Sequence, residues 1–83
     1  MAISVNEPIR VGAVFDHGVT PVWFLWQGRR YHVKTVTMRW QTTEGRATLL
    51  HLSVTDHANL FELVLNQQTL SWAVAAVEPG GCE

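Results

Sequence analysis

The stretch PVWFLWQGRRYHVKTVTMRW, residues 21–40, decides the fold of this chain. At its centre a Gln-Gly step separates two runs rich in β-branched and aromatic residues, which is the pattern of a β-hairpin. The first run, VWFLW, does not alternate between apolar and polar residues. Because successive side chains of a strand point to opposite faces, Trp23 and Leu25 lie on the face opposite Phe24 and Trp26. The hairpin therefore carries large apolar side chains on both of its faces.

The rest of the 83-residue chain also consists of strand-forming runs, which turn residues interrupt at short intervals. No segment carries the apolar spacing of an amphipathic helix over a sufficient length. We therefore expect an all-β domain, a six-stranded antiparallel meander curled into a partly open small barrel or a strongly bent sheet. The predicted strands lie near 9–15, 21–27, 30–40, 46–55, 59–66 and 69–77. One domain spans 1–83, with an ordered core at about 8–78 and a flexible tail at 79–83.

Loop lengths determine which residues face each other across the predicted hairpins. A change in the parity of the apolar positions predicts a β-bulge near Lys34–Thr35. The expected loops are 27–28 or 28–29, 43–45, 57–58 and 67–68. They predict the facing pairs Met38–Leu50, Val36–Leu52, Val54–Phe61, Leu52–Leu63, Leu65–Leu70, Leu63–Trp72 and Phe61–Val74. The predicted core consists of inward-facing residues, namely Val11, Phe15, Phe24, Trp26, Tyr31, Val36, Met38, Leu50, Leu52, Phe61, Leu63, Leu65 and Trp72.

The composition is that of an ordinary folded domain, with 47% hydrophobic residues and a net charge of −1. The one cysteine, Cys82, has no partner for an internal disulfide. The sequence shows neither the pattern of a secretory leader nor an apolar run near the ~20 residues that span a bilayer. We expect a soluble cytoplasmic protein without a membrane partner.

The charged residues are unevenly distributed along the chain. Residues 22–46 contain five of the six Lys and Arg residues but one of the seven acidic residues. Four of these cations lie with aromatic and apolar residues of the predicted outer face or at its rim. They form a candidate interaction face of Trp23, Leu25, Arg29, Arg30, His32, Lys34, Arg39 and His51. Such a face could cover the chain's own termini or contact a protein partner or a second copy. It could also bind single-stranded nucleic acid through stacking and phosphate contacts. We expect the protein contact and keep nucleic acid as the alternative.

Catalytic and metal sites are not indicated by the sequence. The four histidines lack the spacing of zinc ligands, and the two Asp-His pairs lie in predicted turns. Ser53, Ser71 and Cys82 have no neighbouring residues typical of an activated nucleophile. Glu62 points outward opposite Ser53, so a pair of buried carboxylates is not expected either. We predict a non-enzymatic protein without a cofactor, a catalytic site or a metal site.

The motif Trp-x-Gly-Arg-x-Tyr-x-Val, formed here by residues 26–33, is followed by a later Trp and by a last strand that contains Trp. In these features the chain resembles small bacterial proteins that are similar to an actinobacterial domain of unknown function. That domain is sometimes associated with translesion DNA polymerases, so the resemblance implies an accessory role in DNA repair as the alternative function. The matching positions are Trp26, Gly28, Arg29, Tyr31, Val33, Trp40, Leu63 and Trp72.

Overall fold

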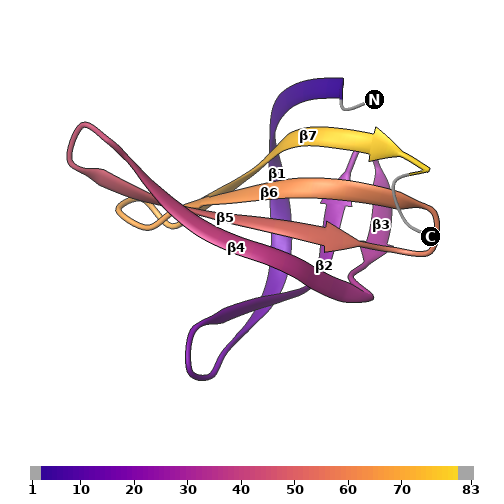
Figure 1. Cartoon of the computed structure of the whole chain (residues 1–83), viewed down its shortest axis with the longest axis horizontal. Helices are drawn as coiled ribbons and strands as arrows, with labels where there is room; N and C mark the ends of the chain where they lie inside the picture. Colours follow the sequence, from indigo (N-terminus) through magenta and orange to yellow (C-terminus); the bar gives the residue numbers. More distant parts are fainter. Residues whose placement is uncertain (1–2, 81–83) are drawn as a thin grey trace.

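The structure is a computed structural model that describes residues 3–80. Its described part is an antiparallel sheet without helices, so the predicted all-β class is confirmed (Figure 1). The sheet has seven strands, where the sequence predicted six, and it is open. The strands are β1 (Ile3–Phe15), β2 (Val19–Trp26), β3 (Arg29–His32), β4 (Thr35–Glu44), β5 (Ala47–Thr55), β6 (Asn59–Asn66) and β7 (Ser71–Pro79). Within residues 3–80 there is accordingly no helix long and apolar enough to cross a membrane.

The strand order β3-β2-β1-β7-β6-β5-β4 explains how the sheet curls. Strands β3 and β4 follow each other in sequence but form the two opposite edges, and only Val33 and Lys34 connect them. The N–H of Val33 donates to the carbonyl of Val22 (2.8 Å), and the N–H of Lys34 donates to the carbonyl of Thr55 (2.7 Å). The connection thus ties β2 to β5. The single strand predicted at 30–40 is divided here, which accounts for the additional strand.

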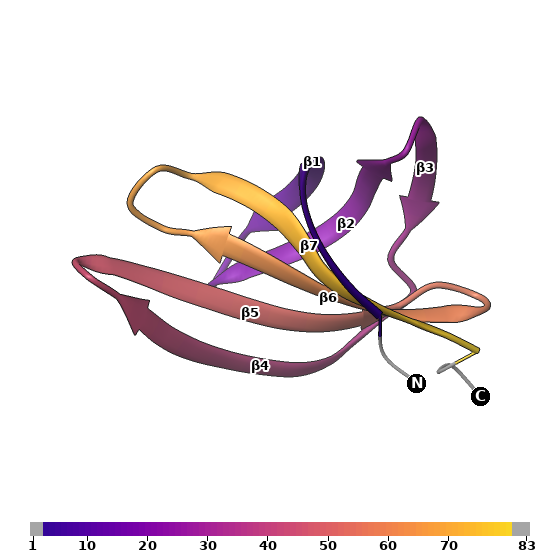
Figure 2. The same ribbon diagram turned by 90° about the horizontal axis from the view of Figure 1, so that it is seen from above.

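The long first strand belongs to both halves of the sheet. Residues 3–9 of β1 pair with β7, and residues 10–15 pair with β2. Strand β1 also begins at Ile3, well before the predicted start near residue 9. Figure 2 shows β4 and β5 on the side of the molecule opposite β2 and β3. The inner faces of these two halves enclose the core, so their outer faces point in opposite directions.

Two of the predicted loops are confirmed. The β2–β3 loop is Gln27-Gly28, whose positive φ angles of 52° and 76° match a two-residue hairpin turn. The β5–β6 loop is residues 57–58, and the Asp56 carboxylate accepts the N–H groups of Ala58 and Asn59, each at 2.7 Å. The pairs that this loop implies, Val54–Phe61 and Leu52–Leu63, are present.

The prediction for β4 is wrong in its register. Glu44 faces Ala47, so the β4–β5 loop is Gly45-Arg46, with Gly45 at φ 61°. The bulge lies at Thr37 and not near Lys34–Thr35, because the register shifts between Val36 and Met38. This shift reverses the facing of every later residue in the strand. Met38 therefore faces Ser53 on the outside and is 60% exposed, so its assignment to the core is wrong.

The β6–β7 loop is longer than predicted. Asn66 faces Ser71 across four loop residues. Within this loop the Asn66 carboxamide oxygen accepts the N–H groups of Gln68 (2.9 Å) and Thr69 (3.2 Å). All three predicted pairs across this hairpin are therefore wrong in register. The observed pairs are Leu65–Trp72, Leu63–Val74 and Phe61–Val77. Between Leu63 and the loop the register differs from the prediction by two residues, so Trp72 and Val74 still face inward, whereas Leu70 lies in the loop and is 69% exposed.

The core joins the two halves of the sheet. Its buried hydrophobic residues are Phe24, Leu52, Val54, Phe61, Leu63, Leu65, Val74 and Val77. The Phe24 ring stacks on Tyr31 (centroids 5.1 Å apart) and meets Phe61 edge-on (4.9 Å). Five predicted core residues are fully buried, and Val11, Trp26, Tyr31, Val36, Leu50 and Trp72 are half-buried against them. The assignment of Phe15 to the core is wrong, because this residue projects beyond the core at the end of β1 and is 68% exposed.

Candidate interaction face

Side chains from three strands form two rows on the outer face of β1–β3. Arg10, Leu25 and Arg30 face each other in one row. Gly12, Trp23 and His32 form the next row. We call the side chains of these two rows the basic face; its members are Arg10, Trp23, Leu25, Arg30 and His32.

Trp23 explains why the first hairpin carries large apolar residues on both faces. Its indole lies against Gly12 of the neighbouring strand, so closely that a Cβ on Gly12 would be 2.1 Å from Trp23 Nε1. The guanidinium carbon of Arg30 lies 4.7 Å from the centre of the Trp23 ring, which is cation–π distance. The indole therefore covers backbone of β1 that would otherwise be exposed to solvent. With Arg30 over its ring, Trp23 is itself half-buried.

The basic face concentrates positive charge in a protein that is slightly acidic overall. Arg10 and Arg30 are exposed, and neither forms an ion pair within residues 3–80. Lys34 follows His32 by two residues and is also exposed. Asp16 is the one acidic residue between positions 8 and 34, and it lies in the β1–β2 loop with His17 as its ion-pair partner. The face is thus a cationic surface with an apolar centre.

The structure separates the other predicted face residues from this surface. Arg29 lies over the Tyr31 ring, 5.8 Å from its centre, near the inner aromatic cluster. Arg39 of β4 spans the open side of the sheet, where its guanidinium donates to the carbonyl of Val19 and to the hydroxyl of Thr20 (3.2 Å). His51 lies on the outer face of β4–β6, which points away from the basic face.

His51 belongs to a cluster that resembles a hydrolytic triad only in its residue types. Its ring stacks on Trp40 (5.1 Å), and its Nε2 lies 2.7 Å from the Thr42 hydroxyl. Its Nδ1 is buried, lies 3.7 Å from Glu62 and has no hydrogen-bond partner within the described residues. A catalytic imidazole needs a group that orients it through this nitrogen. His51 Nδ1 lacks such an orienting hydrogen bond here, and no group of three metal-ligating residues occurs in the described part of the chain.

Sequence reasoning missed Arg10 as a member of the basic face. Arg10 is separated in sequence from the other cations, so counting charge along the chain assigned it to the acidic part. The signal was nevertheless present. Arg10 and Gly12 alternate with the apolar residues Ile9 and Val11, which places both of them on the outer face of their strand.

Comparison of the chain with protein-family models, with curated proteins and with solved structures finds no match. The resemblance to the actinobacterial domain therefore stays a prediction from the motif of residues 26–33.

Proposed function

We propose that the protein is a non-enzymatic interaction module whose basic face binds an acidic segment of a partner protein. One observation carries this proposal. Arg10 and Arg30 flank Leu25 in a single row across three strands, and neither arginine has an ion-pair partner within the described residues. Guanidinium groups bind carboxylates through paired hydrogen bonds, and the leucine between them offers an apolar contact.

The packing of the Trp23 ring favours a protein over single-stranded nucleic acid as the partner. Bases stack on aromatic rings that present a free face. The Trp23 indole already lies against Gly12, and Arg30 is over its ring. An acidic segment can bind Arg10 and Arg30 without displacing this packing, whereas a stacked base would have to replace the guanidinium.

The proposal can be tested by NMR titration of the ¹⁵N-labelled protein. The probes are a peptide of alternating Glu and Leu, a matched peptide of Gln and Leu, and oligothymidine. We expect the Glu peptide to shift the amide resonances of Arg10, Leu25 and Arg30, with an affinity that falls as salt is raised because the charges are exposed. Arg30→Gln should weaken this binding about tenfold, the effect of losing a charge-assisted pair.

Arg46→Gln is the matched control, because it removes an equally exposed arginine from the distant β4–β5 loop. It should leave the affinity for the Glu peptide unchanged. Equal losses for Arg30→Gln and Arg46→Gln would show unspecific charge attraction and contradict the proposal. Binding of oligothymidine in preference to the Glu peptide would replace the proposed partner with single-stranded nucleic acid. A larger species in size-exclusion chromatography that Trp23→Ala abolishes would replace it with a second copy of the chain.

A further inference from the structure

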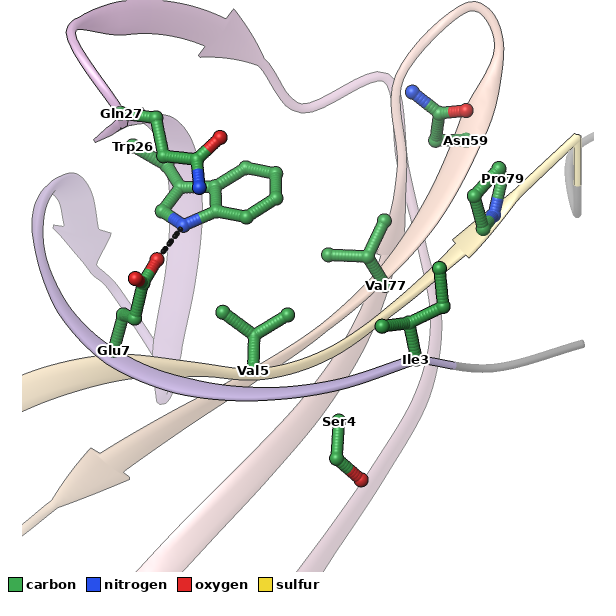
Figure 3. Close-up of a pocket in the computed structure, with 9 residues that line it drawn as sticks. All are labelled: Ile3, Ser4, Val5, Glu7, Trp26, Gln27, Asn59, Val77 and Pro79. Atoms are coloured by element: carbon green, nitrogen blue, oxygen red, sulfur yellow. Dashed lines mark hydrogen bonds between the residues drawn. The ribbon is translucent and has the colours of Figure 1, made fainter.

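A pocket of about 550 Å³ opens at the end of the curled sheet where β1 begins and β7 ends. Figure 3 shows Ile3, Val5, Val77 and Pro79 as its apolar side and the Trp26 indole across from them. This pocket is separate from the basic face, because its residues lie on the inner side of the sheet. Its volume is in the range of small-molecule sites.

The pocket contains one carboxylate in an otherwise apolar row of side chains. The inward residues of β1 are Ile3, Val5, Glu7, Ile9 and Val11. Glu7 faces Val74, a buried core residue, and is itself half-buried. A carboxylate at such a position loses hydration, which is unfavourable unless polar or charged groups replace the lost water.

Two features hold Glu7 in this position. The register of β1 against β7 shifts between Ser4 and Glu7, and Asn6 in this bulge has a φ of 54°, a conformation that asparagine tolerates well. The Trp26 indole N–H donates to Glu7 Oε1 at 2.5 Å (Figure 3). This bond orients the carboxylate beside the aromatic ring. The other oxygen, Oε2, has no ion-pair or hydrogen-bond partner within residues 3–80.

The charged and apolar groups that line the pocket favour a positively charged ligand. No Lys, Arg or His is among its described lining residues, so within residues 3–80 no cation of this pocket lies beside Glu7. An ammonium group beside Glu7 would gain a charge-assisted hydrogen bond to the carboxylate. The aliphatic side of the pocket would then contact an apolar stem. An anion at the same place would be repelled by the carboxylate.

We propose that this pocket binds a primary alkylammonium group carried on an apolar stem, either as a small aliphatic amine or as a lysine side chain. Glu7 pairs with the ammonium, the Trp26 indole N–H orients Glu7, and Ile3, Val5 and Val77 contact the stem. The basic face takes no part in this binding, so a result that contradicts one of the two proposals leaves the other unaffected.

The test is an NMR titration that follows the Trp26 indole N–H resonance, assigned by its loss in Trp26→Phe. The probes are n-pentylamine as its ammonium ion, its neutral isostere n-pentanol, and the anion pentanoate. We expect saturable shifts with n-pentylamine and an affinity at least about tenfold lower for n-pentanol, because the alcohol lacks the charge that Glu7 recognises. Pentanoate should not bind. The affinities are measured on the unmodified protein, and Trp26→Phe serves only to assign the resonance.

Glu7→Gln keeps an acceptor for the Trp26 indole N–H but removes the negative charge. It should lower the affinity for n-pentylamine about tenfold and leave that for n-pentanol unchanged. Glu62→Gln, which neutralises a carboxylate on the outer face of β6, is the control and should change neither affinity. A tripeptide with a central lysine, compared with its norleucine counterpart, distinguishes a side-chain ligand from a free amine. The proposal would be overturned if n-pentylamine and n-pentanol bound with equal affinity. It would also be overturned if neither n-pentylamine nor the lysine peptide gave a saturable shift.

Discussion

Trp23 and Gly12 act as one packed unit on the outer face of β1 and β2. A large aromatic residue next to a glycine on the neighbouring strand covers backbone that would otherwise be open to water. This pairing gives Trp23 a structural role and places the Arg30 guanidinium over its ring. The same contact therefore supports the sheet and positions one of the two arginines of the basic face.

Gly12→Ala should be unfavourable because of this contact. The added methyl group would lie 2.1 Å from Trp23 Nε1, so the indole must move. We expect a loss of about 1–3 kcal/mol in the free energy of unfolding, the usual range for overpacking. In a Trp23→Ala background the same change should have little effect, since the obstructing ring is gone. Urea denaturation of the wild type and the three variants measures this coupling, and an equal loss in both backgrounds would contradict it.

Strand β6 shows how strict alternation separates the core from the surface. Phe61, Leu63 and Leu65 are buried on the inner face. Glu62 lies on the outer face opposite Ser53 and is partly exposed beside His51. This strand is the element whose facing the sequence predicts best, because it alternates without interruption and pairs with β5 in one unbroken register, whereas β7 carries a bulge between Val74 and Ala76.

Leu63→Ala should lower the free energy of unfolding by roughly 2–5 kcal/mol, because it leaves a cavity in the core. In a domain of this size such a loss is a large part of the total stability. Glu62→Ala, one position away, should change the stability by less than about 1 kcal/mol, since its partner lies 3.7 Å away and the carboxylate is partly solvated. Denaturant unfolding of both variants measures the difference. The reverse order would mean that the strand faces the other way.

The open side of the molecule is bridged by one side chain. Arg39 of β4 donates to backbone and side-chain oxygens at the start of β2. These strands lie on either side of the opening and have no ladder pairing with each other. Together with the Val33–Lys34 connection, the arginine holds the two ends of the sheet near each other.

Arg39→Ala should therefore loosen the opening without unfolding the domain. We expect a loss of about 1 kcal/mol in stability, because the two bonds are exposed and each contributes modestly. Amide hydrogen exchange should become faster in β2 and β4 but stay unchanged in β6 and β7, which lie in the middle of the sheet. Arg46→Ala is the control and should alter no strand. A uniform increase in exchange over all strands would show that Arg39 does not act locally.

The all-β class, the β2–β3 and β5–β6 loops and the inward set of β5 and β6 can all be predicted from the sequence. These features depend on local turn chemistry and on the two-residue alternation of neighbouring strands, which are both readable along the chain. The predicted flexible tail lies largely outside the described residues, so it stays a prediction.

The placement of the bulges and the pairing of β1 with β7 depend on long-range contacts that the sequence pattern does not reveal. A bulge adds one residue to a strand, and the sequence around Thr37 accommodates that residue at more than one position. Its position depends on how the whole sheet curls, and it decides whether Met38 faces the core or the solvent. Distant pairing likewise brought Arg10 beside Leu25 and turned Glu7 toward Trp26. Both candidate sites arise from such contacts between strands, because local sequence pattern sets the facing of a residue but not its neighbours.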